Sequence, residues 1–575
     1  MRQENLPSEK FVNLSKTRFR IIPILSAIFL MAFFANPAAA GATTIVRPAA
    51  NTVLHTASVR PVMTLLDPSF DPSLVGGSPF CSSGSLGTIL CYPPNFLKTA
   101  YNFPSTTGKH GLDGTGQTIV IVDAFGSPTI QSDLNTYDAA FGLPDTTITI
   151  LCGPTWTGAT TDNCPVKTIG DLTTAPNALL CGATGWAEET TLDVTMAHSL
   201  APGAHVVLVV ANDCFDSSLY SAELAVVNQQ QYRGSVMSQS FGEPDDLVTC
   251  TATDPTISFC ISTDPTLLNL PNKVFQTALF DRWTVIASSG DEGANENAFY
   301  LNGAQGLALT PSFPATSPLV LAAGGTQGSP YGGTFGGPPG PGGTFQCGPH
   351  QICNTGLVVI NGGANGCGTA VRPGEPTSCS PIGYGGESTW NEVTDFALTG
   401  GNLGYTSGGG FSGLYGVPIY QWFVPHTYTT LLGNTVKATG RMTPDVSFNS
   451  AVYGGVLAYV GFLGRWAVFG GTSAASPAWA GIMALADQAN GRPLGFVNPQ
   501  IYLIGLTGAF YHDGNGASSD SHHANTPFHD ITQGNNAVCS GLCGEDGYLA
   551  QSGYDMTTGW GTPNVSSLIQ ALTFN

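Results

Sequence analysis

Gly470-Gly471-Thr472-Ser473-Ala474-Ala475-Ser476-Pro477 is the stretch that decides the fold and the chemistry of this chain. It places Ser473 among small residues, just ahead of an apolar, helix-like run from Ala478 to Asn490. The two glycines let another backbone approach closely. Pro477 is expected in the first turn of the helix, where no N–H is needed. This pattern suits a nucleophilic hydroxyl beside helix N–H groups that stabilise an oxyanion, although alone it more often marks an N-cap serine.

Two other segments supply acidic side chains that suit such a serine. In Glu188 to Asp193, Glu189 and Asp193 are four residues apart. A helix therefore places both carboxylates on one face, with Cβ atoms about 5–6 Å apart. Because two such carboxylates repel, one is expected to keep its proton to a higher pH than the other. In Val285 to Gly293, a β-type apolar run ends in a Gly-Asp turn, which places Asp291 at a strand terminus.

With these three segments in this order, the chain resembles the sedolisin family of serine-carboxyl peptidases, which combine a subtilisin-like fold with a Ser-Glu-Asp triad. The resemblance extends from about Pro93 to the C-terminus and includes further family-like strings, namely Phe313 to Pro318, Ala323 to Thr326, Ser407 to Ser412 and Thr443 to Val446. It implies an α/β fold, a subtilisin-like three-layer domain with a mainly parallel sheet and disulfide-stapled loop insertions. The alternation of strand-like and helix-like runs favours the same class.

The resemblance also implies a role for each residue. Ser473 is the nucleophile, Glu189 is its base, Asp193 orients that base, and Asp291 donates to the oxyanion. A carboxyl group donates a hydrogen bond only when it is protonated, so this chemistry favours activity in acid. Asp123 ends a buried-strand run and matches a family position that often carries an acid. For Asp123, extension of the carboxylate chain and a purely structural role both remain open.

A histidine-based mechanism is the weaker alternative. A subtilisin-like site would use histidine as the base, but the sequence contains no His-Gly-Thr-His string. His198 and His205 are nearest to the right region. His198 is five residues from Asp193 and therefore off its helix face.

Two segments near the C-terminus, within residues 528–556, resemble the family's calcium-binding loops. They are Phe528 to Thr532 and Gly553 to Asp555. The resemblance implies one structural Ca²⁺, because calcium prefers oxygen ligands. The implied ligands are the carboxylates of Asp530 and Asp555 and the backbone carbonyls of Ile531, Gln551 and Gly553. The family often has glycine where Gln551 stands.

Composition and the N-terminus bear on location and partners. The net charge is −20 and only 10% of residues are charged, which argues against a nucleic-acid partner. Basic residues up to Arg20, an apolar run from Ile21 to Phe34 and Ala38 to Ala40 read as a cleavable signal peptide. We therefore expect a secreted or periplasmic protein with no stable membrane span after signal removal. A retained signal anchor is the alternative.

The expected organisation is a signal peptide at 1–40, a short N-terminal segment at 41–92 and a peptidase domain at 93–575. A long insertion occupies about residues 326–390 of that domain. The segment at 41–92 is much shorter than the prodomain that sedolisins usually carry, so we expect no full-length prodomain here.

The 14 cysteines imply disulfides in an exported chain. Most lie close together in sequence, and nearest-neighbour pairing is the working expectation. The pairs would be 81–91, 152–164, 250–260, 347–353, 367–379 and 539–543, which leaves Cys181 and Cys214 over.

The sequence therefore predicts a secreted, acid-acting serine-carboxyl endopeptidase with protein or peptide substrates. A tripeptidyl-peptidase of the same family and a non-catalytic secreted binding protein on the same fold are the alternatives. An esterase is disfavoured because no Gly-x-Ser-x-Gly elbow surrounds Ser473. For the oligomeric state, a monomer is the default expectation.

Overall fold

The computed structural model describes most of the chain from Val62 onward. The described residues are 62–72, 79–83, 87–108, 111–153, 163–245, 268–296, 309–328, 350, 352–354, 356–363, 379–392, 405–508, 526–538 and 546–573. The predicted signal peptide at 1–40 and the glycine- and proline-rich run at 332–343 lie outside these residues.

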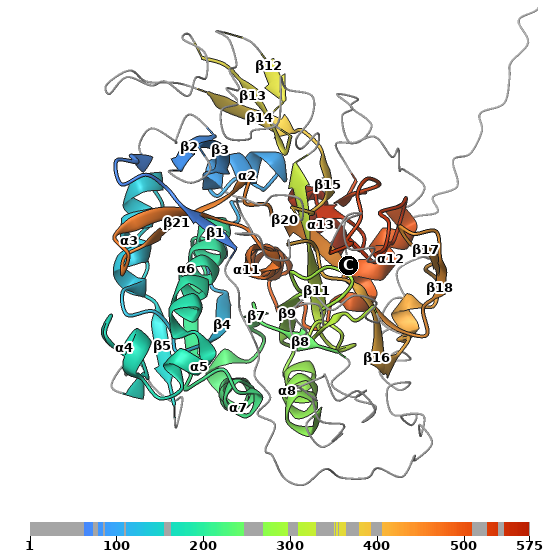
Figure 1. The fold of residues 1–575 in the computed structure, drawn as a ribbon, viewed down its shortest axis with the longest axis horizontal. Helices are drawn as coiled ribbons and strands as arrows, with labels where there is room; N and C mark the ends of the chain where they lie inside the picture. The colour runs from blue at the N-terminus through green and yellow to red at the C-terminus, as the bar shows by residue number, and fades with distance from the viewer. Residues whose placement is uncertain are drawn as a thin grey trace, which may run out of the picture. The chain divides into compact units, whose positions relative to one another are not determined.

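A mainly parallel sheet forms the centre of the domain (Figure 1). Its strand order is β15-β11-β9-β7-β4-β6-β5, and β20 pairs with β11 off this path. All pairings are parallel except β15 with β11. In chain order the strands are β4 (Thr118–Ala124), β5 (Thr149–Cys152), β6 (His205–Ala211), β7 (Val236–Gln239), β9 (Thr284–Ser288), β11 (Leu321–Gly328), β15 (Glu387–Thr389) and β20 (Val446–Asn449). The predicted α/β class with a mainly parallel sheet is confirmed.

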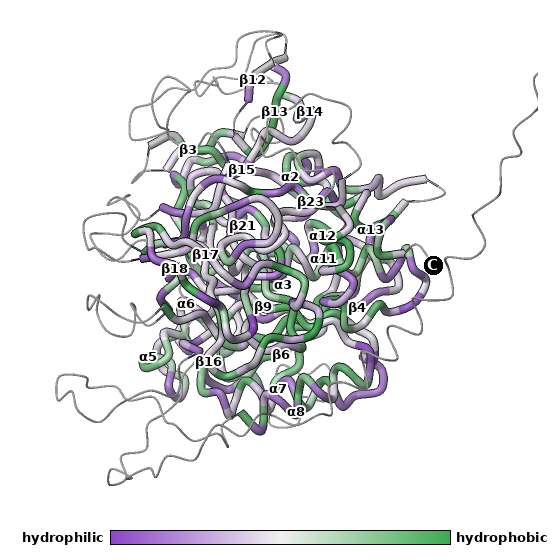
Figure 2. Tube along the Cα trace, turned by 90° about the vertical axis from the view of Figure 1, so that its right-hand side faces the viewer, coloured by the Kyte–Doolittle hydropathy of each residue, from purple (hydrophilic) through white to green (hydrophobic). Residues whose placement is uncertain are grey.

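Helices cover both faces of this sheet and make three layers. α6 (Ala183–Leu200) and α11 (Thr472–Asn490) pack against each other and on one face, while α7 (Asp216–Val227) and α8 (Asn269–Phe280) pack together on the other (Figure 1). α3 (Ile130–Phe141) packs against α6. The central strands are buried almost throughout, and Figure 2 shows hydrophobic residues concentrated along β4 and β6. Such burial on both faces explains their continuous runs of valine, isoleucine and leucine.

A second sheet of five strands has the order β1-β22-β21-β3-β2. Its strands are β1 (Met63–Leu65), β2 (Phe80–Ser83), β3 (Gly87–Tyr92), β21 (Gly455–Val460) and β22 (Arg465–Phe469). Residues from the predicted short N-terminal segment therefore pair with strands that immediately precede the Ser473 turn. The predicted boundary at residue 93 stays a prediction.

Within the predicted insertion at 326–390, three strands form a small antiparallel sheet: β12 (Ile352–Asn354), β13 (Val358–Asn361) and β14 (Ser380–Tyr384). The remaining strands pair in twos, and these are β8 (Glu243–Pro244), β10 (Ser312–Phe313), β16 (Gly410–Gly416), β17 (Thr427–Thr429), β18 (Thr435–Lys437), β19 (Gly440–Thr443), β23 (Phe528–His529) and β24 (Thr562–Pro563). The other helices are α2 (Pro94–Ala100), α4 (Asp171–Thr174), α5 (Ala178–Cys181), α12 (Asn498–Gly508) and α13 (Val565–Thr573), with 3₁₀ turns η3 (Gln230–Tyr232) and η5 (Ile419–Gln421).

Three disulfides lie wholly within the described residues. Cys81–Cys91 and Cys152–Cys164 confirm two of the nearest-neighbour pairs, and the two leftover cysteines pair with each other as Cys181–Cys214. The predicted pairs 250–260, 347–353, 367–379 and 539–543 lie wholly or partly outside the described residues.

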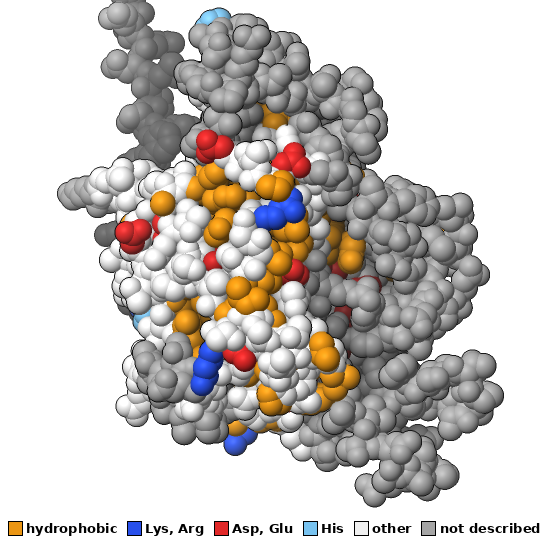
Figure 3. Space-filling view, turned by 60° about the vertical axis from the view of Figure 1, so that its left-hand side comes forward, with side chains coloured by type: hydrophobic (Ala, Val, Ile, Leu, Met, Phe, Trp, Pro, Cys, Tyr) orange, Lys and Arg blue, Asp and Glu red, His pale blue; other side chains and the backbone are white. Residues whose placement is uncertain are grey.

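Two further features concern the surface. Among the described helices, none combines the length and apolar character that crossing a bilayer requires. Figure 3 shows one face on which single acidic and basic side chains are separated by uncharged surface, as expected for a chain with only 10% charged residues.

Candidate active site

The nucleophile turn joins β22 to α11. Gly471 has a left-handed backbone (φ 88°), and its N–H donates to the carbonyl of Ser450 at 2.7 Å. Glycine is needed at this position because the conformation strains other residues. α11 begins at Thr472, so Ser473 lies in its first turn, with 7% of its surface exposed.

The helix begins six residues earlier than the sequence indicated, and this corrects the expected place of Pro477. It lies inside α11 rather than in the first turn. A residue in this position would normally donate its N–H to the carbonyl four residues before, which is that of Ser473. Proline cannot donate. The Ser240 hydroxyl instead lies 3.3 Å from the Ser473 carbonyl oxygen.

A cluster of three buried carboxyl groups includes Glu189, which the Ser473 hydroxyl contacts. Glu189 and Asp193 occupy successive turns of α6, and Asp123 lies near the end of β4. All three are fully buried. Ser240 donates a hydrogen bond to Asp193 Oδ1 at 2.9 Å. The oxygens of Glu189 and Asp123, and Oδ2 of Asp193, have no well-aligned donor within the described part of the chain.

Burial controls the ionisation of this cluster. It raises the pKa of Glu189 well above the usual value, the Ser473 hydroxyl lowers that pKa in part, and the charges of Asp123 and Asp291 raise it again. Burial, then Asp123 and Glu189, likewise raise the pKa of Asp193, which Ser240 lowers. Burial raises the pKa of Asp123 to about 7. The three groups therefore titrate together and retain protons into the weakly acidic range.

Asp291 follows β9 and faces the nucleophile turn. Its Oδ1 accepts hydrogen bonds from the Thr472 N–H at 2.7 Å and the Thr472 hydroxyl at 2.8 Å. Its Oδ2 faces Gly471, where an added Cβ would lie 2.8 Å from that oxygen. Burial raises the pKa of Asp291 to about 6, and the two hydrogen bonds from Thr472 limit the rise. Because Oδ1 is occupied by donors, the proton of neutral Asp291 belongs on Oδ2.

The predicted residues are thus grouped as follows. Glu189 interacts with Ser473, Asp193, Asp123 and Asp291, and Asp291 contacts the residue next to Ser473. Their catalytic roles remain predictions. Sequence reasoning did not single out Thr472 or the hydroxyl of Ser240. The available signals were a threonine next to the nucleophile and a serine at the end of a strand.

The histidines considered as alternative bases have other partners. The Nε2 atom of His198 lies 3.1 Å from Oδ1 of Asp138 on α3, and both side chains are fully buried. His205 Nε2 lies 2.8 Å from the hydroxyl of Thr149. Nothing in these contacts links either histidine to Ser473.

The predicted calcium loops contact each other. Asp530 accepts hydrogen bonds from the Gly553 N–H at 3.0 and 3.2 Å. Buried Asp555 accepts from the Gln551 N–H through Oδ2 and from Thr557 and Thr558 through Oδ1. Burial raises its pKa to about 7.

No group of three or more His, Cys, Asp or Glu side chains suited to a metal exists among the described residues. Any ion would therefore need carbonyl or water oxygens besides the two carboxylates. The implied donor set, with the backbone of Ile531, Gln551 and Gly553, is of this kind, so the residues present fit calcium chemically.

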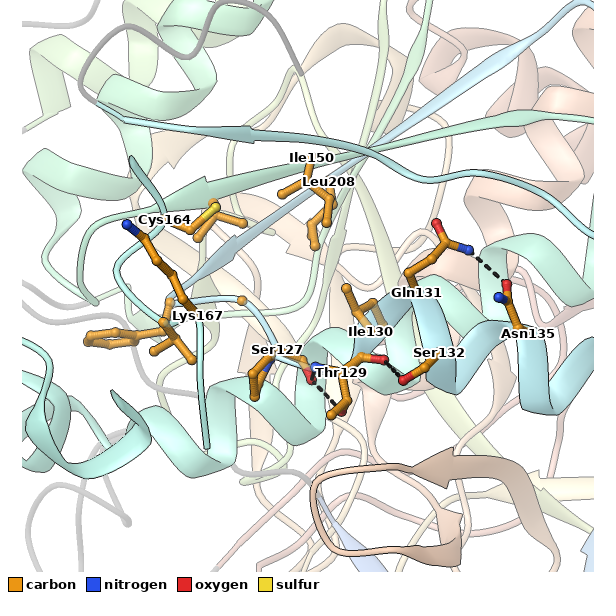
Figure 4. A pocket seen from close by; sticks show the side chains of 15 residues that line it. Ser127, Thr129, Ile130, Gln131, Ser132, Asn135, Ile150, Cys164, Lys167 and Leu208 are labelled. Atoms are coloured by element: carbon orange, nitrogen blue, oxygen red, sulfur yellow. Dashed lines mark hydrogen bonds between the residues drawn. The ribbon is translucent and has the colours of Figure 1, made fainter. Parts of the chain in front are cut away.

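A cavity of about 530 Å³ lies beside the N-terminal end of α3 (Figure 4). Its wall begins at Phe125, two residues after Asp123, and includes Ile150, Leu208 and Val210. Hydrogen bonds such as Gln131 Nε2 to Asn135 Oδ1 (2.8 Å) satisfy polar groups along α3. None of the four predicted catalytic residues lines this cavity.

Several known proteins are similar to this chain. It is 27% identical to kumamolisin of Bacillus sp. (strain MN-32) over 481 residues, which cover 84% of this chain and 63% of that protein. It is 29% identical to sedolisin of Pseudomonas sp. (strain 101) over 305 residues, covering 52% and 37%. A solved structure of Pseudomonas sedolisin, a serine-carboxyl proteinase, superposes with a TM-score of 0.55 at 22% identity, over 85% of this chain and all of that one.

Over most of its length the chain is similar to members of the sedolisin family. Mouse (Mus musculus) tripeptidyl-peptidase 1 is also similar, with 33% identity over 211 residues that cover 35% of this chain and 33% of that protein. The matched regions span less than two thirds of each curated relative. No family model matches the chain. The structural likeness agrees with the sedolisin-type fold.

Proposed function

We propose that the chain is an acid-acting serine-carboxyl endopeptidase. The observation that carries this proposal is the junction of α6, β9 and α11, where a serine, a pair of buried carboxyls and a separate carboxyl with a free oxygen meet. Relatives that are peptidases by name support the same class.

In the proposed reaction, the Ser473 hydroxyl attacks the carbonyl carbon of the scissile bond and its proton passes to Glu189. Asp193 holds Glu189 in place and is itself held by the Ser240 hydroxyl. The negative oxygen of the tetrahedral intermediate accepts a hydrogen bond from the protonated Oδ2 of Asp291. Glu189 then gives its proton to the departing amine, and water releases the acyl group by the same steps.

The Glu189 group and Asp291 must be in opposite protonation states for the reaction, and this requirement defines a working pH range. Glu189 must accept a proton, whereas Asp291 must keep one. Because the pKa of Asp291 is about 6, the rate should fall as the pH rises through that value. The acidic limit is set by the first proton that the coupled Glu189, Asp193 and Asp123 group loses, because one ionised carboxylate in that group is enough for Glu189 to act as the base.

The test is hydrolysis of a mixed-peptide library by purified residues 41–575, scanned from about pH 3 to about pH 8 around the reference carboxyl pKa values. Ser473→Ala should abolish cleavage. Ser476→Ala is the matched control, because Ser476 lies on the same helix but pairs with Ser238. Cleavage that persists in Ser473→Ala would refute the proposal. Cuts three residues from free N-termini would instead indicate a tripeptidyl-peptidase.

Two further parts of the proposal concern context. The chain is exported through the segment at 1–40, and one structural Ca²⁺ is held by Asp530 and Asp555 with carbonyls of Ile531, Gln551 and Gly553. When bound, the ion would neutralise two carboxylates and hold the loops together, with no part in the reaction.

A further inference from the structure

We propose that the strands before residue 93 position the nucleophile turn, so that the working enzyme retains them. We name the described residues 62–72, 79–83 and 87–92 the N-terminal strap. The inference rests on the proposed peptidase function for its activity readouts, and on the strand pairing for its geometry.

The strap makes direct backbone contact with the nucleophile turn. β1 pairs antiparallel with β22, with Met63 opposite Phe469 and Leu65 opposite Ala467. This ladder continues past the end of β22, because the Gly470 N–H donates to the Val62 carbonyl at 2.7 Å. Gly470 is three residues before Ser473. The strap therefore accepts the last hydrogen bond of the β1–β22 ladder before the nucleophile turn.

The turn is held by two successive backbone bonds. Gly470 is bound to Val62 of the strap, and Gly471 is bound to Ser450, which follows β20. The next N–H, that of Thr472, bonds Asp291. A change in the position of Gly470 would therefore move the donor that orients the carboxyl of Asp291. Misplacement by about 1 Å in such an arrangement costs up to about 100-fold in rate.

The strap is itself firmly attached. Val62 and Leu66 are 3% and 0% exposed and belong to a core with Trp466 and Val468 of β22. The Thr64 and Ser83 hydroxyls lie 2.9 Å apart and join β1 to β2. The disulfide between β2 and β3, Cys81–Cys91, stays within the strap, so no disulfide bond of the described residues ties it to the rest of the domain. Cleavage after residue 92 would leave the strap bound only by non-covalent contacts.

Successive backbone N–H groups of β1 point alternately toward β22 and away from it, and this allows a matched pair of proline variants. The Leu66 N–H donates to the Trp466 carbonyl, so the amide of Thr64, two residues earlier, also faces β22, whereas that of Met63 faces away. Thr64→Pro removes an N–H from the ladder, while Met63→Pro inserts the same ring without doing so. Thr64→Val controls for loss of the hydroxyl.

We expect Thr64→Pro to lower kcat at least about tenfold with little change in KM. The substitution disturbs the nucleophile turn and leaves the contacts with substrate in place. Met63→Pro and Thr64→Val should stay within about twofold of wild type. If β1 only stabilises the fold, Thr64→Pro should have a lower unfolding temperature, but the folded variant should keep the wild-type kcat. Wild-type kcat in folded Thr64→Pro would overturn the inference.

Two readouts keep the test independent of folding yield and of the proposed function. Sequencing the N-terminus of the active, acid-treated enzyme should find it at or before Val62, and a fully active enzyme that begins after Leu66 and has lost the strap would overturn the inference. Amide hydrogen exchange of residues 465–476 should be faster in Thr64→Pro than in Met63→Pro. If the wild-type protein cleaves no peptide, the proposed function fails. If amide exchange of residues 465–476 is the same in Thr64→Pro and Met63→Pro, the strap does not position the nucleophile turn.

Discussion

Asp291 Oδ1 accepts both the backbone N–H and the hydroxyl of Thr472, at 2.7 and 2.8 Å. One oxygen of the carboxyl is thereby fixed as an acceptor, and the other is left to carry the proton beside Gly471. A carboxyl is thus oriented as a donor by the residue next to the nucleophile. The pKa of about 6 keeps it neutral only in acid.

The first prediction concerns Asp291→Asn. An amide donates at every pH and its oxygen still accepts from Thr472, so the variant should lose the fall in rate that wild type shows as the pH rises through about 6. The measurement is kcat/KM from acid to neutral pH. If the alkaline limb of the profile is the same in both proteins, ionisation of Asp291 does not set it.

A second prediction uses Thr472→Val. Loss of the hydroxyl removes a hydrogen bond that lowers the pKa of Asp291. The pKa should therefore rise and the alkaline limb should move to higher pH, while kcat in acid falls about tenfold from poorer alignment. Thr472→Ser keeps the hydroxyl and is the control. An alkaline limb that moves to lower pH in Thr472→Val would contradict the assignment.

The sequence predicted the fold well because the buried strands, such as β4 and β6, are continuous apolar runs and the site motifs follow them in order. The grouping of Ser473, Glu189, Asp193 and Asp291 is implied by the sedolisin resemblance. The ends of parallel strands account only for Asp291 and the turn before Ser473. Sequence reasoning placed the start of α11 too late, because proline is usually read as a first-turn residue. The Ser473 carbonyl, which Pro477 leaves without its usual helical donor, lies 3.3 Å from the Ser240 hydroxyl, and this tertiary contact is not visible in the sequence.

The pairing of β1 with β22 could not be predicted from the sequence. The two strands are about four hundred residues apart, and a three-residue strand such as Met63–Leu65 carries almost no periodic signal. Likewise, the sequence marks Thr472 only as part of a motif. Its two hydrogen bonds to Asp291 depend on how β9 and α11 meet, which is a property of packing and not of local pattern.

The third prediction tests the support of the base. Ser240→Ala removes the donor to Asp193 Oδ1, and such bonds to charged groups are worth about 1.5–3 kcal/mol. The pKa of Asp193 should rise, because the Ser240 bond lowers it. We expect kcat to fall at least about tenfold and the acidic limb to shift upward. Ser238→Ala, which removes only a contact with Ser476, should leave the acidic limb in place. A common effect of both variants would point to a general packing defect.

Calcium removal is the fourth prediction. If Asp530 and Asp555 share an ion, chelation should lower the unfolding temperature of wild type, and added Ca²⁺ should restore it. Asp530→Asn should have a lower unfolding temperature from the outset and no further response to chelator. Asp546→Asn is the control, since its carboxylate binds Thr430 and Asn434 outside the proposed ligand set. Indifference of wild type to both chelator and Ca²⁺ would remove the site.

The last prediction concerns stability at neutral pH. Glu223 is fully buried on α7, and burial raises its pKa to about 8 although Gln239 donates to it at 2.5 Å. Because the folded state binds this proton more tightly than the unfolded chain does, its stabilising effect is complete below about pH 4.5. That effect declines as the pH rises and is lost as the pH passes the folded value.

Glu223→Gln, which cannot ionise and can still accept from Gln239, should match wild type in acid. It should exceed wild type in free energy of unfolding by on the order of 2 kcal/mol near pH 8, as measured by chemical denaturation at a series of pH values. Asp171→Asn is the control, because that carboxylate is exposed and its pKa is lowered by the backbone N–H groups of Lys167 and Thr168. It should give no gain at neutral pH. If Glu223→Gln is less stable than wild type at every pH, the buried group is not held as a neutral acid.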